Sequence, residues 1–143
     1  MNFISNSNRN NIKQTTLKNK LFFSGVGIHN GKAVSMSIEP AEPNTGIVFE
    51  RTDINKNNVI KAVIDNVDTT CLCTKIRNKE GVSVSTIEHL MATLNGLNID
   101  NVKIKINAPE LPALDGSSHD YTKKIISSGI KIQSFDRKYI KIL

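Results

Sequence analysis

The chain has 143 residues, of which 38% are hydrophobic and 22% charged, and its formal net charge is +6. This length suits one domain that buries a core without disulfides or structural metals. No apolar run approaches the ~18 residues of a membrane span, so we expect no stable membrane insertion. The basic residues are scattered, without an RNA-binding aromatic motif, a basic helix or zinc-finger spacing, which argues against nucleic acid as a partner.

The N-terminal third is predicted to be an arm followed by strands. Residues 1–12 lack the apolar core and cleavage site of a secretory signal, so we interpret them as a flexible arm. Residues 14–38 have a strand-like pattern interrupted by two glycine-containing turn signals, which predicts an antiparallel meander. Two further strands are predicted in IVFERT and VIKAVIDNV, on either side of the polar residues 55–58.

The next segments, TCLCTKI and VSVS, flank residues 78–81 and predict a β-hairpin. Cys71 and Cys73 would then lie on a strand with their side chains on one face, which is a poor geometry for a disulfide. We therefore expect reduced thiols in the cytoplasm. Without a second cysteine or histidine pair at zinc-site spacing, the two cysteines are interpreted as packing residues or as the wall of a ligand groove.

Two helices are predicted in the second half of the chain. The first begins near Ser85, where Ser85 and Glu88 have the spacing of a capping box, and ends near Gly96. NVKIKIN alternates as a strand, SHDYTKKIISSGI is a helix that Gly129 terminates, and RKYIKIL is a final strand. This order predicts an α+β fold, a two-layer sandwich whose mixed or mostly antiparallel sheet of about five strands is covered by two helices.

Glu88 and His89 are the residues that could carry chemistry. In the first turn of a helix, adjacent side chains diverge by about 100° and can reach different parts of one cleft, which suits a base beside a metal ligand. The helix dipole disfavours an imidazolium there and so favours a neutral, metal-binding His89. On spacing alone the commoner reading is structural: Glu88 closes a capping box and His89 is a polar surface residue.

Three other polar residues have structural explanations. SGVGIHNGK does not have the spacing of a phosphate-binding loop, so we interpret His29 as part of a tight turn. Asp115 precedes a glycine and is predicted to initiate an Asx turn. His119 is predicted to lie in the first turn of the second helix.

The order of five sequence blocks is more specific than any single motif. The blocks are KQTTLKNKLFFSGVGIHNGK, PAEPNTGIVFERTD, LCT, VSTIEHLMATLNGLNIDNVKIKINAPELPALDGSS and SSGI. Over residues 13–143 the chain resembles the UDP-3-O-acyl-N-acetylglucosamine deacetylase family of lipid A biosynthesis. That resemblance implies a Zn²⁺-dependent amidohydrolase that removes the N-acetyl group from UDP-3-O-acyl-N-acetylglucosamine in the cytoplasm of Gram-negative bacteria.

The resemblance also implies roles for individual residues. Glu88 matches the general base that deprotonates zinc-bound water, and His89 matches the zinc ligand of the family's first domain. Leu72 and Cys73 match the strand that borders the substrate groove. His29 and Asp115 fall in the family's recurrent GVG-x-H-x-G and DGS segments, and their roles stay open.

The family draws its other zinc ligands, a His and an Asp four residues later, and a further catalytic His from a second domain. After His89 the only histidine is His119, and Lys123 stands four residues beyond it. We therefore expect a first deacetylase domain at residues 13–132, and at 133–143 a linker and first strand of a missing C-terminal domain. The chain alone would be inactive, with zinc weakly held or absent. The alternative is a naturally short, non-catalytic relative that acts as a sugar-nucleotide-binding or interaction module.

Overall fold

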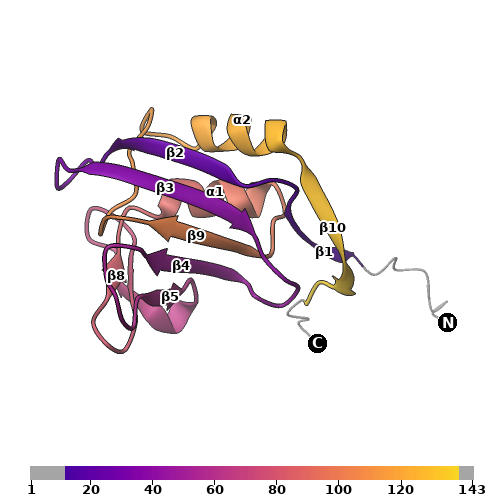
Figure 1. Ribbon diagram of the computed structural model, residues 1–143, viewed down its shortest axis with the longest axis horizontal. Helices are drawn as coiled ribbons and strands as arrows, with labels where there is room; N and C mark the ends of the chain where they lie inside the picture. Colours follow the sequence, from indigo (N-terminus) through magenta and orange to yellow (C-terminus); the bar gives the residue numbers. More distant parts are fainter. Residues whose placement is uncertain (1–11, 139–143) are drawn as a thin grey trace, which may run out of the picture.

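The computed structural model describes residues 12–138 (Figure 1). The strands are β1 (Lys13–Leu17), β2 (Leu21–Val26), β3 (Ala33–Pro40), β4 (Ile47–Arg51), β5 (Val59–Lys61), β6 (Val67–Thr69), β7 (Lys75–Arg77), β8 (Ser83–Val84), β9 (Val102–Ile106) and β10 (Ile130–Asp136). The helices are the short 3-10 helix η1 (Ile64–Asn66) and the α-helices α1 (Glu88–Gly96) and α2 (His119–Ser128). Most of the predicted arm and of the predicted final strand, RKYIKIL, lies outside the described residues.

The centre of the fold is a five-stranded sheet in the order β2-β3-β9-β4-β5. Its neighbouring strands are antiparallel except for β4 and β9, which run parallel with Phe49 opposite Ile104. The predicted mixed sheet is therefore confirmed, including the β2–β3 hairpin. β1 does not belong to the predicted meander, because it leaves this sheet and pairs with β10.

The hydrophobic core fills the space between one face of the sheet and the two helices, with α1 behind the sheet in Figure 1. Ile104 and Ile106 alternate along β9 with half-buried lysines and are fully buried. Leu90 and Leu94 lie four residues apart on α1 and are also fully buried in this core. The α+β sandwich predicted from the sequence is confirmed.

The second helix, α2, lies along β2 (Figure 1) and joins the same core through Tyr121. The Tyr121 ring centroid is 5.1 Å from that of Phe23, and its hydroxyl donates a hydrogen bond of 2.9 Å to the Pro112 carbonyl. Burial raises the pKa of Tyr121. Gly129 ends α2 with φ 85°, as predicted. Neither α1 nor α2, nor any other helix in residues 12–138, is long and apolar enough to cross a membrane.

A two-stranded ribbon of β1 and β10 is fastened to the end of the sheet by Asn101. The Asn101 side chain, 1% exposed, donates to Gln14 at 2.9 Å and to Gln133 at 2.7 Å, and it accepts from the Gly46 amide at 2.8 Å. Buried polar groups that are fully hydrogen-bonded in this way fix one arrangement of the segments that they join. The domain boundary predicted after residue 132 falls within β10, and the division of the chain into domains stays a prediction.

A separate three-stranded sheet, β6-β7-β8, branches from the main sheet after β5. The predicted strand VIKAVIDNV is interrupted there, because Asn66 in η1 turns back and donates from its side chain to the Lys61 carbonyl at 2.8 Å. The predicted hairpin across residues 78–81 is confirmed as β7–β8. Buried Arg51 connects the two sheets: its guanidinium donates to the Ser83 carbonyl at 2.7 Å and to both carboxylate oxygens of Asp53.

The predicted strand position of the cysteines is wrong. Cys71 and Cys73 lie in an irregular loop between β6 and β7, and Leu72 between them has φ 62°. A left-handed residue breaks the alternation of a strand, so the two side chains do not share a strand face. Both cysteines are free thiols.

The core packing of α1 can be tested with Leu94→Ala, which we expect to lower the free energy of unfolding by about 2–5 kcal/mol because it leaves a cavity at a fully buried site. Urea unfolding followed by circular dichroism measures the change. Asn95→Ala, at the neighbouring exposed position, is the control and should change stability by less than about 0.5 kcal/mol. Similar losses for both variants would contradict this description of the core.

The connection through Arg51 can be tested by pH. Hydrogen bonding to the Arg51 guanidinium holds the pKa of the Asp53 carboxyl below its ordinary value of 3.8. The ionised carboxylate therefore stabilises the fold above that value, and this contribution is lost as the pH falls through the lower pKa of the folded state. We expect Asp53→Asn to be destabilising at pH 7 and less so below about pH 4, when urea unfolding is measured at each pH. Equal destabilisation at both pH values would contradict a stabilising role of the ionised Asp53 carboxylate.

Candidate functional site

The start of α1 lies at the edge of the sheet where the parallel strands β4 and β9 both end. Thr52, just after β4, donates its amide to the Ile106 carbonyl at the end of β9, at 2.8 Å. The Ser85 amide bonds the Pro109 carbonyl at 2.9 Å, and the Leu111 amide bonds the Ser85 carbonyl at 3.1 Å. The segment before α1 is thereby bound to the segment after β9, which fixes where Glu88 and His89 emerge.

Glu88 does not close a capping box, so that prediction is wrong. The N-cap is Ile87, which makes no side-chain cap bond, and the Ser85 hydroxyl instead donates to the Pro109 carbonyl at 3.2 Å. The half-buried Glu88 carboxylate accepts a hydrogen bond of 3.0 Å from the Thr74 amide. The spacing of Ser85 and Glu88 is that of a capping box, but both side chains are engaged by segments distant in the sequence.

Thr86 gives the chain the sharp turn with which α1 begins. Its φ is 58°, in the left-handed region that β-branched residues seldom adopt. Its side chain is buried, and the hydroxyl donates to the Glu110 carboxylate at 3.1 Å. Such strained conformations persist where surrounding contacts enforce them, and they are concentrated at functional sites.

His89 is half-buried on the first turn of α1. Its carbonyl accepts hydrogen bonds from the Thr93 hydroxyl at 3.0 Å and from the Ser118 hydroxyl at 3.1 Å, which joins the start of α2 to α1. Its imidazole makes no hydrogen bond to any residue in the range 12–138. Both ring nitrogens are therefore available to a ligand.

The loop that contains Leu72 and Cys73 is bonded to the start of α1 through Thr74. Thr74, the next residue, bonds α1 twice: its amide donates to Glu88, and its carbonyl accepts from the Ile87 amide at 3.3 Å. Cys73 is half-buried, whereas the Leu72 side chain is 87% exposed. Thr74 thus connects the loop to the start of α1, while Leu72, two residues earlier, is exposed.

These features can be compared with known proteins. The profile of the family described as "LpxC: UDP-3-O-acyl N-acetylglycosamine deacetylase" matches residues 14–143. The chain belongs to this family. It is 44% identical over 131 residues to the UDP-3-O-acyl-N-acetylglucosamine deacetylase of Haemophilus influenzae (strain PittEE) and 43% identical to that of Histophilus somni (strain 129Pt). Each match covers 92% of this chain but only 43% of the relative, so the chain spans less than half the length of these deacetylases.

The zinc ion that the deacetylase resemblance implies does not fit the described residues by themselves. Within residues 12–138, no group of three or more His, Cys, Asp or Glu side chains is arranged to hold a metal ion. A catalytic zinc takes about three protein ligands. Among residues 12–138, His89 could therefore supply no more than one ligand of such a site.

The other residues considered from the sequence are His29, Asp115 and His119. The predicted tight turn around His29 is confirmed, with Gly31 at φ 63° and its amide bonded to the Gly27 carbonyl at 3.0 Å. The predicted Asx turn is also confirmed, since Asp115 accepts hydrogen bonds from Ser117, which lower the pKa of the Asp115 carboxyl. His119 is the exposed first residue of α2.

Sequence reasoning missed Glu110, which binds the turn containing His29 to the start of α1. Its buried carboxylate accepts from the His29 amide at 2.9 Å, the Asn30 amide at 3.0 Å and the Thr86 hydroxyl. The only signal in the sequence is the acidic residue itself, between two prolines in APELP, where a loop would ordinarily expose it.

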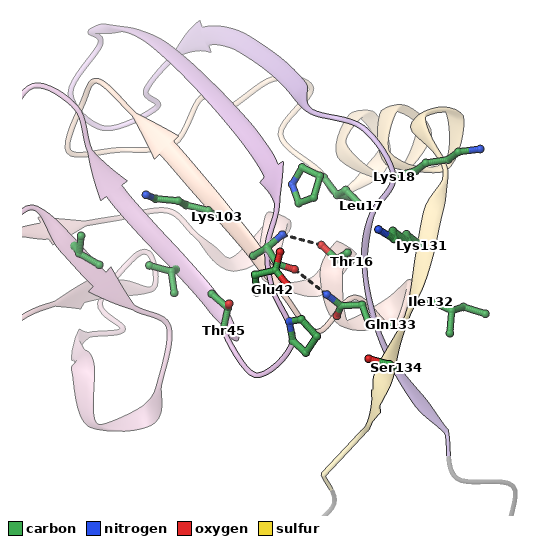
Figure 2. Close-up of a pocket in the computed structure, with 15 residues that line it drawn as sticks. Thr16, Leu17, Lys18, Glu42, Thr45, Lys103, Lys131, Ile132, Gln133 and Ser134 are labelled. Atoms are coloured by element: carbon green, nitrogen blue, oxygen red, sulfur yellow. Dashed lines mark hydrogen bonds between the residues drawn. The ribbon is translucent and has the colours of Figure 1, made fainter.

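The hollow shown in Figure 2 lies elsewhere, between the β1–β10 ribbon, the loop after β3 and the β4–β5 edge. Two hydrogen bonds cross it: the Ala41 amide donates to the Thr16 hydroxyl at 3.0 Å, and the Gln133 side chain donates to the Ala41 carbonyl at 2.8 Å. None of the site residues predicted from the sequence lines it. This hollow therefore contributes nothing to the candidate site.

The packing beneath the site can be tested at Gly27, where an added Cβ would lie 2.5 Å from Glu110 Oε2. We expect Gly27→Ala to lower the free energy of unfolding by about 1–3 kcal/mol, because the Glu110 carboxylate can move away only by losing its hydrogen bonds to His29, Asn30 and Thr86. Gly96→Ala is the control: its Cβ meets nothing within 4 Å, and it should be neutral or stabilising. Thermal unfolding compares the two, and equal stabilities would refute the close approach of Gly27 to Glu110.

Proposed function

We propose that the chain is the N-terminal half of a zinc-dependent deacetylase that removes the N-acetyl group from UDP-3-O-acyl-N-acetylglucosamine in the cytoplasm, in lipid A biosynthesis. The observation that carries this is the Glu88–His89 pair at the start of α1, with the carboxylate held by the Thr74 amide, in a chain 44% identical to named deacetylases. The exposed, apolar Leu72 lies in the loop that Thr74 bonds to this pair, which is compatible with a substrate that bears an acyl chain.

Glu88 is proposed as the general base. Amide hydrolysis requires a group that accepts a proton from the attacking water as the tetrahedral intermediate forms. The Glu88 carboxylate is half-buried at the start of α1. One hydrogen bond from Thr74 fixes its direction and leaves lone pairs for water.

His89 is proposed as one zinc ligand, and Leu72 and Cys73 as part of the substrate groove. The free imidazole nitrogens support the first role, and the contact of residues 71–74 with the start of α1 supports the second. When bound, zinc would polarise the amide carbonyl as a Lewis acid. The other ligands would come from the second domain that the greater length of the relatives indicates.

In this proposal residues 13–132 form the first domain, and residues 133–143 lead toward the second. The isolated chain is inactive, because a single histidine cannot hold a catalytic zinc tightly. A non-catalytic module that binds the sugar nucleotide is the second candidate function, since the loop containing Leu72 is preformed without the rest of the enzyme.

A fusion of this chain to the part of the Haemophilus influenzae relative that it does not cover tests the proposal. We expect the fusion to deacetylate the substrate and the isolated chain with added zinc to show no turnover. Glu88→Ala should retain zinc and lose about 10²–10⁴-fold in kcat, the range for a lost general base. His89→Ala should lose the zinc, measured by atomic absorption.

Glu80→Ala, in the exposed turn of the β7–β8 hairpin, is the control and should leave both readouts unchanged. Unchanged zinc content in His89→Ala would overturn the ligand assignment, and robust turnover by the isolated chain would overturn its inactivity. A fusion that binds the sugar nucleotide with zinc present but never hydrolyses it would favour the non-catalytic module.

A further inference from the structure

Glu110 is the one buried carboxylate in the described part of the chain, with 2% of its surface exposed. No lysine or arginine among residues 12–138 forms an ion pair with it. Removing an unpaired carboxylate from water is costly, so it is tolerated only where hydrogen-bond donors replace the water. The hydrogen-bond donors around Glu110 therefore identify the segments that this carboxylate connects.

Three donors converge on this carboxylate from two distant segments. The His29 amide and the Thr86 hydroxyl both donate to Oε1, at 2.9 and 3.1 Å, and the Asn30 amide donates to Oε2 at 3.0 Å. Hydrogen bonds to an ionised acceptor are about twice as strong as neutral ones. Glu110 thus joins the turn at residues 27–31 to the residue that precedes the α1 N-cap.

The bond to Thr86 is the one that reaches the candidate site. Thr86 holds a left-handed φ of 58° two residues before Glu88, and its main-chain neighbour Ser85 forms a parallel bridge with Glu110. The same acidic residue therefore fixes the strained turn through both its backbone and its side chain. If the turn relaxed, Glu88 would move away from the Thr74 amide that orients its carboxylate.

We propose that Glu110 is a positioning residue for the Glu88–His89 site. Its buried carboxylate clamps the left-handed Thr86 and the turn that carries His29, and so aims Glu88 at Thr74 before any ligand binds. This inference rests on the proposed function, because the positioning of Glu88 matters for catalysis only if Glu88 is the base of the deacetylase. The clamp itself is a property of this chain and can be measured without turnover.

The test uses Glu110→Gln in the 143-residue chain, with amide hydrogen exchange followed by NMR. A glutamine amide accepts hydrogen bonds at one oxygen only, so its NH₂ group must face one of the two backbone donors at His29 and Asn30. We expect exchange at Thr74 and at these two amides to accelerate at least about tenfold, the effect of losing one charge-assisted hydrogen bond. Exchange at Ile104 in β9 reports global stability and provides the baseline for each variant.

Glu39→Gln is the matched control, because Glu39 is a half-buried carboxylate in ion pairs with Lys20 and Lys105. It should leave exchange at Thr74 unchanged relative to Ile104. Thr86→Val, which keeps the shape and removes the hydroxyl, should accelerate exchange at Thr74 but not at His29. It remains informative if Glu110→Gln does not fold.

The outcomes separate the two proposals. If Thr74 exchanges at the wild-type rate relative to Ile104 in both Glu110→Gln and Thr86→Val, Glu110 only pins the turn around His29 and the positioning role is wrong. If the exchange results are as expected but the fusion enzyme shows no deacetylation, the clamp stands and the proposed function fails.

Discussion

The parallel pairing of β4 with β9 is the constraint on which the rest of the structure depends. Parallel neighbours cannot be joined by a hairpin, so the chain must leave the sheet and cross over before it returns. This crossover contains β5, the small sheet and α1, and it brings the first turn of α1 to the edge where both strands end. The position of Glu88 and His89 is thus a consequence of strand order, with the contacts around Ser85 and Thr74 supplying the final alignment.

Buried polar groups act together with apolar packing to fix the segments at that edge. Arg51 joins the small sheet to β4, and Glu110 joins the turn around His29 to Thr86. Each is an expensive group to bury, and each is satisfied by donors or acceptors from other segments of the chain. Fully hydrogen-bonded networks of this kind favour one arrangement of the loops that they connect.

The sequence predicts the elements whose periodicity is strong, including the β2–β3 hairpin, the β7–β8 hairpin and both helices. It fails where a partner lies far away along the chain. The predicted capping box is wrong because the Glu88 carboxylate accepts a hydrogen bond from the Thr74 amide and not from the Ser85 amide. Nor can composition reveal that Leu72 is left-handed, or that Glu110 bonds Thr86 across 24 residues. Local patterns record backbone preference, whereas a site is assembled by tertiary contacts.

In the proposed enzyme this half would bring an oriented base and a single imidazole to a site that the other half completes. The Thr74–Glu88 bond and the Glu110 clamp lie wholly within this chain, so the base is aimed before the domains meet. Because the side chain is already ordered, docking of the two domains would not have to offset the entropy cost of ordering it, which favours assembly. Metal binding, in contrast, would not be complete before docking. One ligand binds a metal ion weakly, and tight binding would require the ligands of the other half. In the proposed enzyme, the direction of the Glu88 carboxylate would therefore be set by this half, whereas binding of the metal would depend on the other.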